Sequence, residues 1–253
     1  MTTHRPHVEA APGSLWERAP DHLAYRGSRE NITGLLEDRP DVAGVPVPAC
    51  PGWTVRDVVG HLVEVCRTVA ADAPGNLWEV PHAEPAADSA DGVGDGPGGG
   101  LGGLLAEWSQ LDVRVEHVVT TAPQLRHTML MMDAFTHELD LRGALGVPVV
   151  RDHASYPSSL DLVVRGFANA VRTHGLPALR IEAPGAAWTA GDGEPAAVLR
   201  GHRHDLLRSL TGRRSLAQIA ELAWSAAPEP WLPAFTWGPF HPPTVPVEAT
   251  VEG

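Results

Sequence analysis

Three side chains in two separate stretches of the sequence are of types that bind divalent metal ions. His61 lies in the run "VRDVVGHLVEV", and Asp133 and His137 lie one helical turn apart in "MLMMDAFTHELDLRG", residues 129–143. Asp133 stands among apolar residues in this stretch. Burying its carboxylate there costs free energy unless a cation, a hydrogen-bond donor or a metal ion interacts with it. A catalytic zinc site has three protein ligands, such as two imidazoles and one carboxylate, and keeps its fourth position open. Structural zinc sites usually have four protein ligands.

Asp140 follows His137 by three residues, so a helix places both side chains on the face that also carries Asp133. Two interpretations stay open for Asp140. It holds an N–H group of a metal-binding imidazole, or it pairs with Arg142 or another arginine near the end of the helix. The expected metal is zinc, and nickel or ferrous iron is compatible, because nitrogen and oxygen ligands select weakly among these ions.

Four helices are needed to position these side chains. Helical patterns cover residues 21–38, 54–73, 104–119 and 124–145, and the second is the clearest because Thr54 and Asp57 form a capping box before a periodic apolar run. Residues 81–103 contain eight glycines and three prolines, so we expect a flexible loop there. Residues 14–150 therefore predict a four-helix bundle with one long crossover.

The sequence after residue 150 changes in character. A helical pattern at 158–175 precedes three short strand-like runs at 178–184, 186–190 and 196–201, and helical patterns return at 204–212 and 215–224. The tail alternates proline with aromatic residues, so we expect it to pack back over a domain. Residues 151–246 thus predict a smaller C-terminal α+β domain, and the fold as a whole is expected to be mostly α.

Composition excludes several classes of function. The net charge of −12 argues against nucleic acid and anionic membrane surfaces as partners. No apolar run approaches the roughly 20 residues of a membrane span, and the first residues lack the apolar core of a signal peptide, so we expect a cytoplasmic protein, monomeric or homodimeric. All 19 basic residues are arginine, which excludes Schiff-base lysine chemistry and indicates a high-GC genome such as an actinobacterial one.

The remaining reactive side chains have plainer interpretations. Cys50 and Cys66 are expected to be structural, because they are too few for a disulfide framework and no cation marks either thiol as activated. His202 and His204 are expected at the surface. Two further arginines, Arg213 and Arg214, either meet an anion or simply lie near the C-terminus of a helix.

Two segments carry a resemblance to a known family. "VPACPGWTVRDVVGHL" and "DAFTHELDLRGALG" resemble the metal-binding domain of the mycothiol-dependent maleylpyruvate isomerase family, within the wider DinB-like four-helix superfamily. The resemblance implies that His61, Asp133 and His137 bind a divalent metal, although the isomerase itself has Glu where this chain has Asp133. Residues 178–240 resemble the smaller C-terminal domain of the same family.

The resemblance implies a thiol-dependent enzyme. The low-molecular-weight thiol mycothiol would bind the metal as a thiolate and attack an electrophilic small molecule, giving either S-transfer or isomerisation. Two alternatives stay open. One is a hydrolase that uses metal-bound water, with Asp140, Glu64 or Glu138 as its general base. The other is a protein that binds a metal or a small ligand without turnover.

Overall fold

The computed structural model describes residues 18–72, 77, 100–121 and 124–248, which divide into two compact units. One unit runs from Ala19 to Val150. The other contains Arg18 and the chain from Arg151 onward. Among the described residues, no helix combines the length and apolar character of a membrane span.

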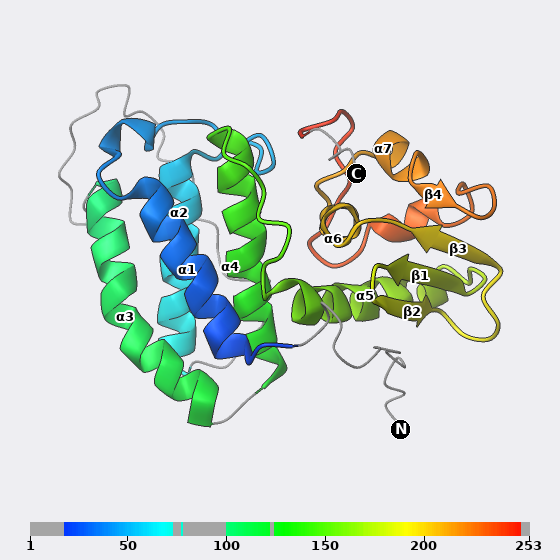
Figure 1. Ribbon diagram of the computed structural model, residues 1–253, viewed down its shortest axis with the longest axis horizontal. Helices are drawn as coiled ribbons and strands as arrows, with labels where there is room; N and C mark the ends of the chain where they lie inside the picture. Colours follow the sequence, from blue (N-terminus) through cyan, green and yellow to red (C-terminus); the bar gives the residue numbers. More distant parts are fainter. Residues whose placement is uncertain (1–17, 73–76, 78–99, 122–123, 249–253) are drawn as a thin grey trace. The chain divides into compact units, whose positions relative to one another are not determined.

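The first unit is a four-helix bundle, as the sequence predicted. It consists of α1 (Asp21–Leu36), α2 (Val55–Ala70), α3 (Leu101–Thr121) and α4 (Leu125–Ala144). Helix α1 packs mainly against α4, and α2 packs mainly against α3 (Figure 1). The bundle core is made of apolar side chains that include Ile32, Val59, Leu62, Trp108 and Phe135. This core holds α2 and α4, the two helices that carry the predicted ligands.

The predicted capping box fixes the first residue of α2. The Thr54 side chain accepts a hydrogen bond from the Asp57 backbone N–H, and the Asp57 carboxylate accepts the Thr54 N–H at 2.8 Å. Two donors that the helix cannot satisfy internally are thereby satisfied. Val55, Val58 and Val59 are fully buried in the turns that follow, so the position of His61 along α2 is set from both the cap and the core.

Helix α3 begins earlier than the sequence indicated. We expected the glycine-rich loop to extend to residue 103, but Leu101, Gly102 and Gly103 already belong to the helix. The buried side chains of Leu101 and Leu105 lie one turn apart, and their packing outweighs the poor helix propensity of the two glycines. The rest of that loop, residues 81–99, lies outside the described residues.

Helix α4 is buried on almost every side. Its buried residues include polar ones, among them His137, Glu138 and Asp140. Burial raises the pKa of the Glu138 carboxyl, and hydrogen bonds from Arg142 at 2.8 Å and from Asn31 at 3.0 Å oppose that rise. The Glu138 carboxylate is therefore bound by groups on its own helix and on α1. Asp133, His137 and Asp140 lie on the opposite side of α4.

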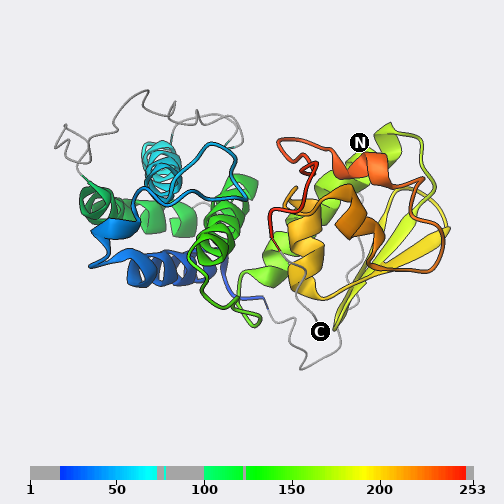
Figure 2. The same cartoon turned by 90° about the horizontal axis from the view of Figure 1, so that it is seen from above.

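The second unit is the predicted α+β domain. It contains α5 (Tyr156–Thr173), β1 (Leu179–Ala183), β2 (Ala186–Ala190), β3 (Ala197–Arg200), α6 (Arg203–Leu210), α7 (Leu216–Ala220) and β4 (Ala223–Trp224). The sheet order is β2-β1-β3-β4, and the β1–β3 pair is parallel while the other two pairs are antiparallel. Helices α5 and α6 pack together on one side of this sheet (Figure 2).

One predicted helix in this unit is too long. We expected a helix over 215–224, but α7 ends at Ala220 and Trp224 belongs to β4, opposite Leu199 of β3. Backbone pairing with β3 outweighs the helical pattern of this segment. The capping box at the start of α7 is confirmed, because the Ser215 side chain accepts from the Gln218 N–H and the Gln218 side chain accepts from the Ser215 N–H.

The aromatic tail packs back on its own unit, as expected. Trp231, Phe235 and Phe240 are buried, and the ring of Phe235 lies 4.7 Å from the ring of Phe167 on α5, measured between centroids. The Trp237 ring lies directly against Gly166, where a side chain would not fit. The tail therefore completes the core of the second unit.

Candidate metal centre

The three predicted ligands come together inside the bundle. His61 on α2 and Asp133 and His137 on α4 each direct one ligand atom to a common region, and these atoms all lie within 4.8 Å of one another. The His61 Nε2 atom is 3.2 Å from Asp133 Oδ2, and the His137 Nε2 atom is 3.6 Å from Asp133 Oδ1. Side chains from two helices thus converge as the sequence predicted.

The spacing of these atoms suits a shared ion. Ligands at about 2.0–2.1 Å from a tetrahedral zinc ion lie roughly 3.3–3.4 Å from each other, close to the two separations above. The longer separation, 3.6 Å between His137 Nε2 and Asp133 Oδ1, exceeds a normal N–H···O hydrogen bond. Two neutral imidazoles and one carboxylate are also a donor set that zinc, nickel and ferrous iron accept. The residues present therefore fit a divalent metal.

Asp140 contacts His137, which favours the first of the two interpretations left open by the sequence. The Asp140 Oδ2 atom lies 2.9 Å from His137 Nδ1, and Arg142 pairs with Glu138 at 2.8 Å. An ionised carboxylate only accepts, so this contact places the ring proton on Nδ1. The lone pair of His137 is then on Nε2, the nitrogen that faces Asp133 and His61.

Cys50 adds a thiol to this arrangement that the sequence analysis did not assign to the site. The Cys50 Sγ atom lies 3.3 Å from Asp140 Oδ2, within reach of an S–H···O hydrogen bond, and 3.8 Å from His137 Nδ1. Cys50, His137 and Asp140 form a second cluster of potential ligands, and all three are buried. The imidazole of His137 thus has a different group of side chains at each of its two nitrogens.

Trp53 is a second neighbour that was not anticipated. Its ring lies 5.4 Å from the His61 ring and is stacked at 6.1 Å on the His137 ring, measured between centroids. Pro51 and Gly52 form a turn in which the Trp53 N–H donates to the Cys50 carbonyl at 2.9 Å, with Gly52 at φ 84°. A Pro-Gly pair predicts such a type II turn. That signal was available in the sequence and would have placed Cys50 and Trp53 side by side.

The three candidate ligands differ in exposure. The side chains of His61 and His137 are 6% and 8% exposed, whereas that of Asp133 is 19% exposed. Solvent therefore reaches the group from the side of the carboxylate. A buried pair of imidazoles with one partly exposed ligand is the arrangement expected of a site that admits a small molecule rather than of a closed structural site.

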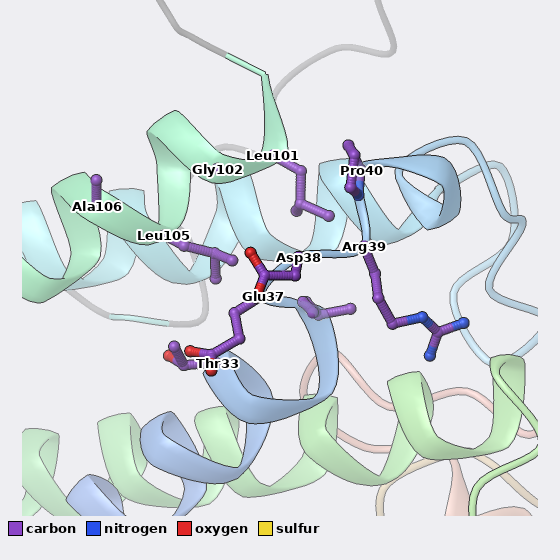
Figure 3. A pocket seen from close by; sticks show the side chains of 10 residues that line it. Thr33, Glu37, Asp38, Arg39, Pro40, Leu101, Gly102, Leu105 and Ala106 are labelled. Carbon is purple, nitrogen blue, oxygen red and sulfur yellow. The ribbon is translucent and has the colours of Figure 1, made fainter.

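A separate cavity of about 480 Å³ lies between the end of α1 and the beginning of α3 (Figure 3). Its lining includes Leu36, Glu37, Arg39, Leu101 and Leu105. None of the three candidate ligands is among its lining residues. This cavity is therefore not the access route to the metal centre.

The other cysteine is structural, in agreement with expectation. Cys66 is buried in the bundle, where its sulfur lies 2.8 Å from the Tyr25 hydroxyl and 3.1 Å from the Trp108 indole nitrogen. Burial raises the pKa of the Cys66 thiol to about 12, so the thiol stays protonated at neutral pH. A protonated, buried thiol is a poor nucleophile and a poor metal ligand.

The histidines and arginines of the second unit only partly follow expectation. His202 caps α6 and is partly exposed, but the prediction that His204 is a surface residue is wrong. The His204 Nδ1 atom lies 3.0 Å from the Tyr156 hydroxyl, and α6 is packed on that side. Arg213 donates to the Thr211 carbonyl at 2.7 Å, whereas Arg214 is buried and meets carboxylates.

Comparison with known proteins agrees with these observations. Residues 25–142 match the mycothiol maleylpyruvate isomerase N-terminal domain. An uncharacterized protein of Mycobacterium tuberculosis strain H37Rv is 26% identical, with 82% of this chain and 90% of that protein covered, and its counterpart in strain CDC 1551 gives the same values.

Solved structures give a similar result. The crystal structure of the mycothiol-dependent maleylpyruvate isomerase matches with a TM-score of 0.52 at 11% sequence identity, and 82% of this chain and 92% of that chain are covered. A point mutant of the same enzyme matches equally well. At this identity the match concerns the fold, while the matched domain includes all three candidate ligands. Residues 25–142 are thus similar to the N-terminal domain of the mycothiol maleylpyruvate isomerases.

Proposed function

We propose that this protein is a divalent-metal-dependent enzyme that activates the thiol mycothiol for transfer to, or isomerisation of, an electrophilic small molecule. The observation that carries the proposal is the convergence of His61, Asp133 and His137 within 4.8 Å inside the bundle. Similarity to this family supports the choice of thiol, because the matched domain and the similar enzyme are both named for mycothiol.

In this proposal the three side chains hold the metal, and the remaining position is left for the thiol sulfur. A divalent ion such as zinc removes the proton of a thiol that binds it and so supplies a thiolate at neutral pH. Asp140 keeps the proton of His137 on Nδ1, and the Nε2 lone pair stays directed at the metal position. Trp53 covers both imidazoles and excludes water from that side.

The same thiolate serves two reactions. Addition to a conjugated double bond followed by bond rotation and expulsion of the thiolate gives isomerisation, and addition without expulsion gives S-transfer. The solvent-facing side at Asp133 is where the electrophile would approach. The identity of the electrophile is not part of the proposal.

Each carboxylate that the sequence offered as a general base for the hydrolase alternative already has a partner among the described residues. Glu64 is 43% exposed and pairs with Arg67, while Glu138 is fully buried and pairs with Arg142. Asp140 is already bonded to His137 and to Cys50. The third candidate, ligand binding without turnover, differs from the proposal in chemistry rather than in site, so activity measurements separate the two.

The test is metal content and thiol binding together. Purified wild type is expected to retain about one equivalent of zinc, nickel or iron by elemental analysis, and H61A and H137A are expected to lose it. In the cobalt-substituted wild type, mycothiol should produce a thiolate-to-cobalt absorption band and release one proton per thiol bound. Equal metal content in wild type and H137A would refute the site.

A matched control separates the ligands from other histidines. H127A changes a buried histidine at the start of α4 that belongs to neither cluster of potential ligands, so its metal content is expected to equal that of wild type. If an electrophile is converted only when mycothiol is present, the result supports the proposed thiol-dependent enzyme. Hydrolysis without thiol supports the hydrolase, and a cobalt–thiolate band without any product supports a binding protein.

A further inference from the structure

A second charged site lies in the C-terminal unit, apart from the metal centre. Arg208 on α6 and Arg214 in the turn before α7 are 0% and 1% exposed, and both guanidinium groups contact the carboxylate of Glu248. Burying two guanidinium groups completely costs free energy unless anions pair with them. We propose that Arg208 and Arg214 form a binding site for a small carboxylate ligand, and that Glu248 of the C-terminal segment occupies it as a displaceable internal stand-in.

The contacts to Glu248 are those of a recognised ligand. Arg208 binds both carboxylate oxygens, with Nε 2.7 Å from Oε1 and Nη2 2.8 Å from Oε2, and Arg214 Nη1 contacts Oε1 as well. Gln218 donates from Nε2 to the Glu248 backbone carbonyl at 2.9 Å. Bidentate guanidinium–carboxylate pairing is the geometry by which proteins recognise free carboxylates.

The charge of the cluster requires an anion at this position. Asp205 pairs with Arg214 at 3.1 Å, and Glu248 is the carboxylate that both guanidinium groups contact. The Nε atom of Arg214 has no hydrogen-bond partner within the part of the chain that the structure describes. The field of the two arginines also lowers the pKa of the neighbouring His204, whose burial lowers it most, to about 3. A ligand that takes the place of Glu248 therefore has to be anionic.

The segment that carries Glu248 is anchored and short. The Phe240 side chain is buried, and the backbone of His241 passes so close to Gly212 that a Cβ atom there would lie 2.8 Å from the His241 nitrogen. Six residues lie between His241 and Glu248, and Val245 among them is 65% exposed. A tether of this length gives an effective concentration on the order of millimolar or above, so a free carboxylate competes only when it exceeds that level.

The inference goes beyond the proposed function and does not depend on it. It predicts that carboxylate binding and release of the tail are linked, since both compete for the same two guanidinium groups. The metal centre, Cys50 and Trp53 have no part in this competition. A protein without bound metal is expected to show the same carboxylate response.

The first test uses E248Q, which keeps the shape of the side chain and removes its charge. Sodium acetate is expected to raise the melting temperature of E248Q saturably, by about 4 °C at saturation, relative to sodium chloride at equal ionic strength. Wild type and E229Q, which changes an exposed glutamate of the same unit, should respond equally to the two salts at acetate concentrations below those that displace the tethered carboxylate. The same response of E248Q to acetate and to chloride would overturn the proposal and leave Glu248 as a structural ion pair.

The second test needs no variant and holds even where E248Q does not fold. Hydrogen exchange of wild type is followed by mass spectrometry in the peptide that contains Glu248. Acetate on the order of 100 mM or higher, in excess over the tethered carboxylate, is expected to speed exchange in this peptide relative to chloride. Unchanged exchange would show that the tail is not displaceable.

Discussion

Asp140 offers a sharp test of how the metal centre is built. Its carboxylate has no exposed area in the side chain and lies 2.9 Å from His137 Nδ1, where it is placed to accept the ring N–H and to hold the ring orientation. Replacing such a partner of a metal-binding histidine typically weakens metal binding by about 10- to 100-fold. D140A is therefore expected to raise the zinc dissociation constant within that range, which corresponds to roughly 1.4–2.7 kcal/mol.

The amide variant should have a smaller effect. D140N keeps an oxygen that accepts the His137 N–H group but loses the charge, so its loss is expected near the lower end, about tenfold. C50S replaces one donor to Asp140 with another and should bind zinc within about threefold of wild type. Competition against a chromophoric chelator at neutral pH gives the zinc dissociation constants of wild type, D140A, D140N and C50S under the same conditions.

Two controls make the result interpretable. E107Q changes an exposed carboxylate on α3 and should leave zinc affinity unchanged. Circular dichroism with a chelator present checks that D140A is folded before metal is added. Wild-type affinity in D140A, combined with loss of binding in H137A, would refute the view that Asp140 orients the ligand.

Two further predictions concern stability. Because His204 has a folded pKa of about 3, below its value of about 6.5 in unfolded chains, its contribution is complete above pH 6.5 and is lost as pH falls toward 3. The glutamine of H204Q cannot be protonated, so the urea midpoint of this variant should fall less than that of wild type between pH 7 and pH 5. The free energy of unfolding of wild type is expected to drop by about 2 kcal/mol more than that of H204Q over this range. Parallel pH profiles of the two proteins would contradict this. G166A places a Cβ against the Trp237 ring and should cost about 1–3 kcal/mol, whereas G34A, with nothing within 4 Å, should stabilise by up to about 1 kcal/mol. Both are measured by urea denaturation, and equal effects of the two substitutions would show that the Trp237 contact does not matter.

The sequence predicted those features that depend on local patterns. The start of α2 follows from Thr54 and Asp57, whose side chains bond to backbone groups three residues away. Asp133 and His137 share a face because helical spacing alone puts them there. The resemblance of the two ligand segments pointed to the same family whose N-terminal domain matches residues 25–142.

Features that depend on distant contacts were harder to predict. The strand at Trp224 exists because β3 pairs with it, and nothing in its own pattern shows that partner. The burial of His204 likewise requires α5, which supplies Tyr156. Whether Asp140 meets His137 or an arginine could not be decided from spacing, because spacing along one helix does not show which arginines from other elements lie nearby. The structure itself shows that Arg142 pairs with Glu138 and that Asp140 contacts His137.

The burial of α4 on nearly all sides has a consequence for how such a centre can change over time. Any shift of that helix would disturb packing with its neighbours, so the positions of Asp133 and His137 are fixed by the interior as a whole. The connection that carries Cys50 and Trp53 is instead an irregular segment, held by backbone hydrogen bonds around one turn and by the contacts of these two side chains. We expect relatives that act on other substrates to conserve the residues of α4 and to differ in the turn around Cys50 and Trp53.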